Sequence, residues 1–265
     1  MLTNMLNSVF TVSSEGHELT NFIAIIRSFM GDGSVAGFLA RWENVIFSLL
    51  IALIIVLVMR AAGRKKEMIP SGLQNVVEML VETLENFIVG VIGPRGRKFV
   101  PFLGTLFLYI WVMNVAGIIP LFKSPTASVN QTIALALCVF IYVQFTGFKE
   151  LGLKGYVDHM AGQPRTPIQW AFVPLMLPIH LIGEVAKPMS LSLRLFGNVT
   201  GEDILLFIFV SLGVSVLSFV PIPVGIPLHV PFIFLALLTS FIQALVFMLL
   251  STIYFSMMLP HEEHH

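Results

Sequence analysis

The sequence predicts an all-α integral membrane protein, and two observations carry this prediction. Hydrophobic residues make up 56% of the 265 residues and charged residues only 11%, whereas a soluble domain averages roughly 25% charged residues. Five stretches are also long and apolar enough to cross a bilayer as helices, which takes about 20 residues each. We therefore expect five membrane-crossing helices surrounded by membrane lipid.

The expected crossings differ in length. The third is short and should extend a little at either end, and the last two are longer than one perpendicular crossing requires. Excess length is accommodated by tilting or by lying partly along the membrane plane. Together the crossings form a single membrane domain, 44–259, and lie at about 44–62, 99–122, 132–148, 170–217 and 230–259.

A further segment, at about 71–93, has the pattern of an amphipathic helix. Leu73, Val77 and Leu80 recur at helical spacing, and Glu78 and Glu82 lie between them. A helix that lies on lipid usually carries a Lys/Arg-rich polar face, whereas this polar face is acidic. We therefore favour docking on another subunit over attachment to the cytoplasmic membrane surface.

The basic residues predict the orientation of the chain. Most of them fall in the loops after the first and third crossings, and only Arg27, Arg41 and Lys123 fall in the loops of the opposite side. By the positive-inside rule, the N-terminal segment 1–43 lies outside and the tail 260–265 is cytoplasmic. The odd number of crossings agrees with this orientation.

Composition and motifs indicate no cofactor. Lys+Arg and Asp+Glu both number 15, so the net charge argues neither for nor against a nucleic-acid partner, and we expect none. Cys138 is the single cysteine, which excludes a disulfide within the chain. The sequence contains no Gly-rich phosphate loop and no His/Cys spacing typical of a metal site. We therefore expect no nucleotide, haem, flavin or metal site.

Arg194 is the candidate functional residue, because it places a charge inside the apolar fourth crossing. Ionisable groups at membrane depth are costly and usually face a polar cavity, a partner charge or a transport path. A guanidinium cannot lose its proton to avoid that cost. Lys187, Ser190 and Asn198 share its helix face at spacings of three or four residues. No carboxylate lies beside it within the helix, so we expect the partner on another helix or another chain.

Other polar residues of the last two crossings flank Arg194. His180 lies close to the same stripe about four turns earlier, and Glu184 lies roughly a quarter-turn off it. Glu202 and Asp203 lie two to three turns later, toward the outer side. Each also has a structural interpretation, because His180 can sit at the helix entry and both acids can lie at the outer interface. Lys187 can likewise extend to the cytoplasmic interface.

The last crossing offers an uncharged partner for the arginine. Gln243 has two hydrogen-bond donors and an acceptor, so its burial requires partners. A neutral hydrogen bond between Gln243 and Arg194 would satisfy both and leave the positive charge available. His229 lies in the Pro-rich loop before this crossing and is the weakest candidate for a functional role.

These motifs resemble the a subunit (subunit 6) of the F-type rotary ATP synthase. The stretch from Lys187 to Asn198, KPMSLSLRLFGN, is similar to the signature of that family. The stretch IQALVFM at 242–248 resembles its last helix, and Asn114 with NQTIALA at 130–136 resembles its middle crossings. The likeness extends in order and spacing from about Asn44 to Leu259.

The resemblance implies a function. In that family this subunit lies against a ring of c subunits, each with a carboxylate in mid-membrane, and two half-channels lead ions to the ring from opposite sides. Arg194 matches the essential arginine, which would favour the ionised carboxylate and block direct ion flow between the half-channels. The implied partners are the c ring, the peripheral-stalk b subunits and the remaining synthase subunits. The implied location is an energy-transducing membrane, for which we expect the bacterial inner membrane.

The resemblance also assigns individual residues. Asn198 and Asp203 match outer half-channel positions, and Gln243 matches the glutamine that faces the arginine. His180 takes the place of a carboxylate near the cytoplasmic exit, a group that Glu184 can supply instead. Lys187 and Ser190 match motif positions without an assigned role. In some relatives a histidine of the last helix partners the outer acid; Ala236 stands at that position, and His229 is at best a displaced substitute.

Two other classes of function compete with this interpretation. A self-contained ion antiporter or channel should carry its own membrane carboxylate opposite Arg194 and should transport ions alone. A structural scaffold should tolerate loss of the Arg194 charge. The subunit is expected not to be an enzyme on its own, since nucleotide chemistry would belong to other subunits. The choice between H⁺ and Na⁺ depends on the c subunit, and H⁺ is the commoner case.

Overall fold

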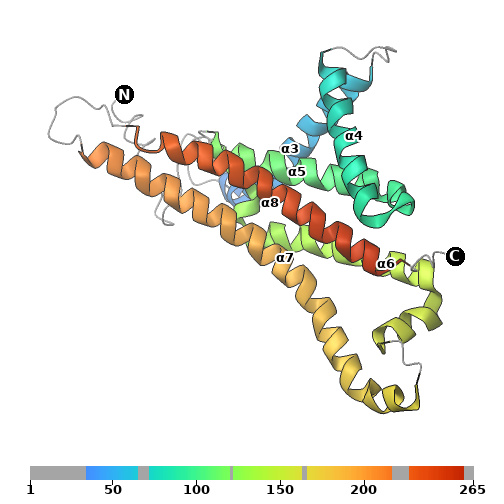
Figure 1. Ribbon diagram of the computed structural model, residues 1–265. Helices are drawn as coiled ribbons and strands as arrows, with labels where there is room; N and C mark the ends of the chain where they lie inside the picture. Colours follow the sequence, from blue (N-terminus) through green and yellow to red (C-terminus); the bar gives the residue numbers. More distant parts are fainter. Residues whose placement is uncertain (1–33, 65–71, 120–121, 163–165, 217–226, 260–265) are drawn as a thin grey trace. The chain divides into compact units, whose positions relative to one another are not determined.

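The computed structural model describes residues 34–64, 72–119, 122–162, 166–216 and 227–259. Over these residues every regular element is a helix (Figure 1). The expected outer segment 1–43 is therefore described only from residue 34, and the expected tail 260–265 lies outside the described residues. The helices, in chain order, are α3 (Ser34–Gly63), α4 (Leu73–Ile92), η1 (Pro94–Phe99), α5 (Val100–Ile118), η2 (Pro125–Ala127), α6 (Val129–Met160), α7 (Pro167–Val216) and α8 (Val230–Met257).

Among the described residues, five helical segments are long and apolar enough to cross a membrane, which confirms the predicted all-α membrane fold. The second crossing was expected to reach residue 122, but α5 ends at Ile118. Pro120 explains the earlier end, because a proline disfavours helical geometry in the residue before it. The amphipathic segment is confirmed as α4, which buries Leu84 and Ile88.

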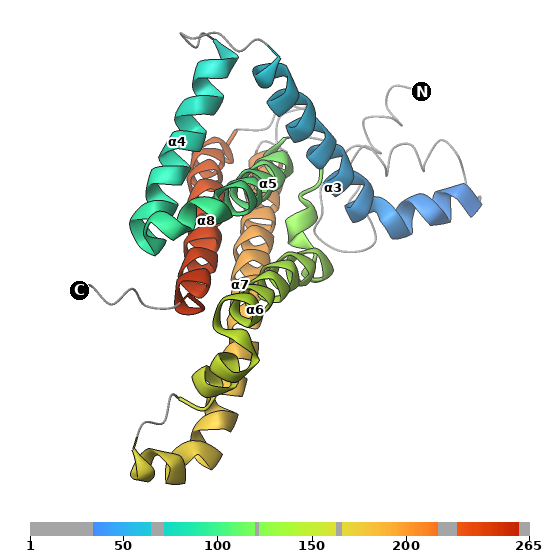
Figure 2. The same ribbon diagram turned by 90° about the vertical axis from the view of Figure 1, so that its right-hand side faces the viewer.

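The third crossing is the one that differs most from expectation. It was expected to extend only a little beyond 148, whereas α6 continues to Met160. Gly152 interrupts it with φ 68° and ψ 170°, a backbone conformation that glycine adopts without a steric penalty. Figure 2 shows the change of direction between the two segments of α6. The break turns the last part of α6 away from the axis of its first part.

The chain divides into two compact units, and α5, α7 and α8 each contribute to both. The first unit comprises the described parts of 1–65, 108–131 and 195–245, and the second those of 66–107, 132–194 and 246–265.

Polar contacts and aromatic pairs hold the first unit together. The Tyr109 hydroxyl donates to the Ser48 carbonyl at 3.2 Å, which joins α5 to α3. The ring of Phe209 in α7 stacks on that of Phe232 in α8 with centroids 3.8 Å apart. Further contacts fix the segment after α5: the Ser124 hydroxyl donates to the Met113 carbonyl at 3.1 Å. The two hydrogen bonds give the Tyr109 and Ser124 hydroxyls acceptors that lipid tails could not provide.

An aromatic cluster lies at the centre of the second unit. Phe99 and Phe255 are 2% and 0% exposed, and their rings stack with centroids 4.5 Å apart. The ring of Tyr142 meets both of them edge-on. Such pairs contribute about 0.5–1.5 kcal/mol beyond the area that they bury. The cluster therefore joins η1, α6 and α8 in one core.

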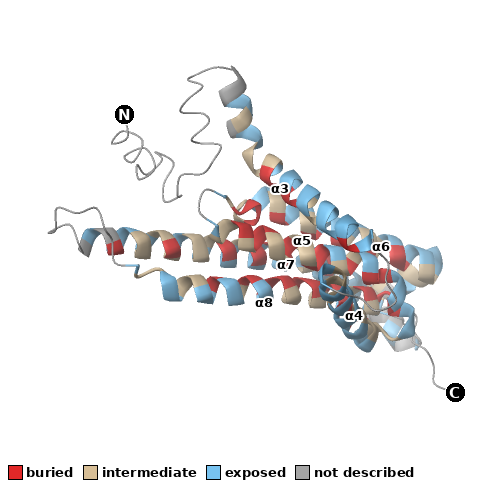
Figure 3. Cartoon of the chain, turned by 90° about the horizontal axis from the view of Figure 1, so that it is seen from above, coloured by how far each residue is buried: buried red, intermediate tan, exposed pale blue. Residues whose placement is uncertain are grey.

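The crossings differ in how much of their surface the chain itself covers. Half of the residues in the most apolar part of Pro94–Ile118 are buried, but only 22% in Arg41–Gly63 and 17% in Val173–Gly213. Figure 3 shows exposed residues recurring along α3. Because large apolar surfaces are covered in native membranes by lipid or by other subunits, α3 and α7 must make most of their contacts outside this chain.

Gly117→Ala should destabilise the subunit, because α5 and the following segment approach closely at this residue. An added Cβ would lie 2.6 Å from Ser124 Cβ, a separation at which something must shift. Overpacking of this kind costs about 1–3 kcal/mol. We expect a lower thermal midpoint of the detergent-solubilised membrane sector.

Gly104→Ala is the matched control in the same helix, since its Cβ would meet Leu84 Cδ1 at an ordinary 3.7 Å. Equal thermal midpoints for the two variants would contradict the close approach at Gly117.

Candidate functional site

Helix α7 carries most of the residues that the sequence singled out. It runs from Pro167 to Val216 and contains Pro174, Pro178 and Pro188 within its length. Each proline removes one backbone donor, a loss that membrane helices tolerate where neighbouring groups satisfy the freed carbonyl. The apolar composition of the helix allows it to continue through the membrane, so its few polar side chains occur at defined depths.

Arg194 lies on the exposed face of α7. Its neighbours Leu191 and Leu195 are 2% and 0% exposed, so the helix packs its apolar face within the chain and leaves the guanidinium outside. Within its own unit, Arg194 makes no ion pair with any described carboxylate. Tyr254 of α8 interacts with it electrostatically. The guanidinium is thus exposed and has no ion-pair partner among the described carboxylates of this unit.

The first unit contains a hollow of about 420 Å³ between α7 and α8. Its polar lining comes from Asn198, Glu202 and Thr239, and the Thr239 hydroxyl interacts with the Glu202 carboxyl. The rest of the lining is apolar or glycine. The volume is enough for several water molecules, each of which occupies about 30 Å³ in the liquid. A carboxyl group therefore faces a space that water can fill.

A buried amide lies next to this hollow. Asn198 Nδ2 donates to Gln243 Oε1 at 2.6 Å, and Gln243 is 4% exposed. Gln243 Nε2 is buried and has no hydrogen-bond partner among the described residues. An unsatisfied buried donor costs about 1–3 kcal/mol, so this amide is a site where a further acceptor would bind favourably.

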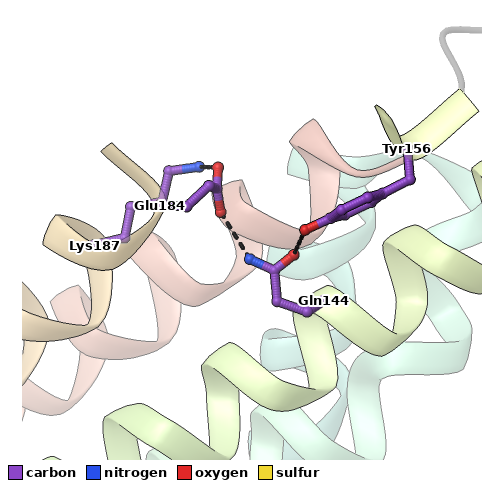
Figure 4. Close-up of polar contacts among 4 residues, drawn as sticks. All are labelled: Gln144, Tyr156, Glu184 and Lys187. Atoms are coloured by element: carbon purple, nitrogen blue, oxygen red, sulfur yellow. Dashed lines mark hydrogen bonds and ion pairs between the residues drawn. The ribbon is translucent and has the colours of Figure 1, made fainter. Parts of the chain in front are cut away.

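A polar cluster in the second unit surrounds Glu184, which is 7% exposed (Figure 4). Lys187 forms an ion pair with Glu184 Oε1. Gln144 Nε2 donates to Glu184 Oε2 at 2.9 Å, and the Tyr156 hydroxyl donates to Gln144 Oε1 at 2.6 Å. Lys187 Nζ also lies 5.4 Å from the centroid of the Tyr254 ring. Both oxygens of the buried carboxylate therefore have partners.

Beside this cluster lies a cavity of about 10 Å³, lined by Glu184, Lys187 and Tyr254 together with apolar residues. That volume is close to the minimum that one water molecule requires. The second unit thus has a narrow pocket that is mostly apolar but has Glu184 and Lys187 in its wall, in contrast to the wide hollow of the first.

The structure brings some of the predicted residues together and leaves others apart. Asn198 and Glu202 share the hollow, and Glu184 and Lys187 form an ion pair. Asp203 is half-buried and is not part of the lining of the hollow. Arg194 and Gln243 belong to different units, so their contact stays a prediction.

Three further candidates have structural surroundings of their own. His180 is exposed, with Nδ1 3.1 Å from the Met176 carbonyl of its own helix. Ser190 is exposed on α7. The His229 carbonyl accepts the backbone N–H groups of Phe232 and Ile233 at 3.0 Å each, so this residue directly precedes α8 and accepts its first hydrogen bonds. It does not line the hollow.

Sequence reasoning assigned no role to Gln144, Tyr156, Thr239 or Tyr254. Thr239 could have been found, because it precedes Gln243 by four residues and so shares its helix face. Gln144 is a single amide in an apolar crossing, which is a weaker signal. Tyr156 gave no signal, since it follows Gln144 by twelve residues and meets it only through the break at Gly152.

Comparison with known proteins agrees with the architecture and the motifs. Residues 45–256 match the family ATP synthase A chain. The chain is 50% identical over 237 residues to ATP synthase subunit a of Protochlamydia amoebophila, which covers 89% of this chain and 88% of that protein. It is 43% identical over 219 residues to ATP synthase subunit a of Solidesulfovibrio magneticus, with 83% and 85% covered. The corresponding protein of Trichlorobacter lovleyi is 40% identical over 225 residues, with 85% and 87% covered.

These relatives are membrane subunits of a larger complex and not its catalytic subunits, and they do not favour a self-contained antiporter or channel. Five membrane-crossing helices, a charged fourth crossing and similarity over most of the chain all agree. The chain therefore belongs to the ATP synthase A chain family, the proton-translocating a subunits of the membrane Fo sector of ATP synthase.

Proposed function

We propose that Arg194 is the fixed charge that separates two half-channels, through which protons reach and leave carboxylates on a ring of c subunits. One observation carries the proposal: Arg194 lies exposed on α7, with the polar pocket of Glu184 earlier in the helix and the hollow of Glu202 later in it. Glu184 precedes Arg194 by ten residues and Glu202 follows it by eight, so the arginine separates the two acids along the chain. The two acids are therefore suited to serve opposite halves of the membrane.

The charge of Arg194 explains why its partner should come from another subunit. A guanidinium at membrane depth needs an anion or water, and no described carboxylate of its own unit forms an ion pair with Arg194. A c-subunit carboxylate that approaches Arg194 would be stabilised in its ionised form. It would release its proton before passing, and the fixed positive charge would repel protons that moved directly between the half-channels.

The hollow in the first unit is our candidate for the outer half-channel. Glu202 lines this hollow and Asp203 does not, so Glu202 is the acid that would take up the proton. Asn198 lines the same space and orients Gln243. The open donor of Gln243 would then bind water or an anion at the inner end of the path.

The pocket in the second unit is our candidate for the inner half-channel. Glu184 is its carboxyl, and Lys187 compensates the charge of the ionised form. His180 and Ser190 lie exposed on the same helix, and we propose that they border the path from the cytoplasm. We also propose that the N-terminus lies outside and the C-terminus in the cytoplasm, with the protein in a bacterial inner membrane, because most basic residues fall in the loops after the first and third crossings.

Helix α4 is our candidate for contact with the peripheral stalk. Val76 and Met79 are 58% and 63% exposed although both are apolar, and Gln74 donates to Glu78 at 2.9 Å on the exposed side. A helix with an uncovered apolar surface and an acidic polar face is better suited to a protein partner than to an anionic lipid surface. The b subunits are the partners that the family implies.

Arg194→Ala in the assembled complex should abolish ATP-driven proton pumping, because the carboxylate would keep its proton as it passes. Passive proton leak through the membrane sector should rise if the charge is also the barrier. The measurement is quenching of a pH-sensitive dye in inverted membrane vesicles, with Arg41→Ala, an exposed arginine at the start of the first crossing, as the matched control. Pumping at the rate of the control would refute the role proposed for Arg194.

Glu202→Gln should slow proton flow by about a hundredfold or more, the usual contribution of a positioned acid–base group. Asp203→Asn, the same change one residue later, should retain most of the flow because Asp203 does not line the hollow. Proton flux into liposomes that contain the membrane sector measures both. The reverse order of the two effects would assign the outer acid to Asp203.

A further inference from the structure

Two hydrogen bonds link Tyr156 to Glu184 through Gln144, and each has a defined donor and acceptor (Figure 4). Tyr156 donates to Gln144 Oε1, and Gln144 Nε2 in turn donates to Glu184 Oε2. The amide therefore presents its donor end to the carboxylate and its acceptor end to the phenol. This orientation suits an ionised Oε2, because an ionised carboxylate oxygen accepts hydrogen bonds and cannot donate them, whereas a protonated Oε2 would carry an O–H with no acceptor in front of it. Oε1 is already paired with Lys187, which leaves Oε2 as the oxygen that a proton would bind.

The opposite orientation of the amide suits the protonated carboxyl. The oxygen and nitrogen ends of a glutamine side chain occupy nearly the same space. With the amide reversed, Oε1 would accept the new O–H of Glu184, and Nε2 would donate to Tyr156. A tyrosine hydroxyl both donates and accepts, so Tyr156 can complete either arrangement. A donor-only residue at this position could complete only the first.

We propose that Gln144 and Tyr156 form an amide switch that positions hydrogen-bond partners for Glu184 in both of its protonation states. The inference rests on the proposed place of Glu184 in the inner half-channel. When a proton from water binds to a carboxylate oxygen, the Gln144 amide turns by half a rotation and Tyr156 changes from donor to acceptor. When the proton leaves, the sequence reverses. The proton never enters the amide, and no other covalent bond forms or breaks.

The switch depends on the break in α6. Twelve residues of uninterrupted helix rise about 18 Å, which is too far for a Tyr156 hydroxyl to reach Gln144. Gly152, at φ 68°, turns the chain back so that the two side chains meet. The ring of Tyr156 then stacks on Phe148, with centroids 4.0 Å apart. The stack holds the phenol in place while the amide turns.

The other charged and titratable groups at this site also keep a partner in both states. Among the described residues, the groups of this kind that interact with Glu184 are Lys187 from α7, Tyr156 from α6 and Tyr254 from α8. Lys187 loses its counter-charge when Glu184 becomes neutral, but its Nζ remains 5.4 Å from the Tyr254 ring. A cation over an aromatic face is attracted at this distance. Protonation of Glu184 therefore leaves neither the Gln144 amide nor the Lys187 ammonium group without an interaction partner.

Infrared difference spectroscopy tests the switch directly, because the C–O band of a tyrosine differs between donor and acceptor states. The sample is the assembled membrane sector in liposomes, with labelled tyrosine, titrated with pH. We expect one tyrosine band to shift together with the appearance of the protonated Glu184 band. The shift should be absent in Tyr156→Phe and in Glu184→Gln, and it should persist in Tyr142→Phe, the matched control in the same helix.

A double-mutant cycle tests the consequence for transport. Tyr156→Phe should slow proton flow by about tenfold, since a buried hydrogen bond is lost. In a Gln144→Leu background the same change should have little further effect, because Tyr156 acts through Gln144. A Glu184 band that titrates while every tyrosine band stays fixed would overturn the switch. If the bands shift together but Glu184→Gln leaves proton flow unchanged, the switch stands and the inner half-channel of the proposed function falls.

Discussion

The exposed guanidinium of Arg194 is the main constraint on this membrane subunit, because a permanent charge at membrane depth requires a partner anion or water. In α7 Leu191 and Leu195 are almost fully buried, while only 17% of the residues in the most apolar part of the helix are buried within the chain. The cost of the charge must therefore be offset by groups outside the chain, either water or an anion. A subunit built in this way is complete only in its assembly, and membership of the Fo sector supplies that assembly.

The two polar sites on either side of Arg194 differ in a way that bears on how protons would move. The hollow beside Glu202 has a volume of about 420 Å³, and the cavity beside Glu184 only about 10 Å³. Water in the larger space can reorganise around either charge state of its acid. The cavity beside Glu184 has room for about one water molecule, so neighbouring side chains would have to provide the hydrogen bonds that water provides in the larger space. Gln144 and Tyr156 have the chemistry for that task, which is why we assign the switch to the narrow site.

The sequence allowed the crossings, α4 and the special position of Arg194 to be predicted, because apolar length, helical period and a charge at membrane depth are all local signals. The contact between Tyr156 and Gln144 could not be predicted from the sequence. Nothing in the polar stretch after residue 148 indicated that α6 continues, and the positive φ of Gly152 is what brings the two side chains together. The choice between Glu202 and Asp203 was also out of reach, since adjacent residues differ by about 100° around a helix and only the position of α8 decides which one faces the hollow.

The central claim is that Arg194 meets a carboxylate of a neighbouring subunit, and a crosslink tests it most directly. With Cys138 replaced by serine, a cysteine in place of Arg194 would be paired with a cysteine in place of the c-subunit carboxylate, in membranes under mild oxidation. Leu191→Cys, three residues earlier and 2% exposed, provides the matched control. We predict a disulfide between the a and c subunits at position 194 and none at position 191. No crosslink at 194, or equal crosslinking at both positions, would contradict it.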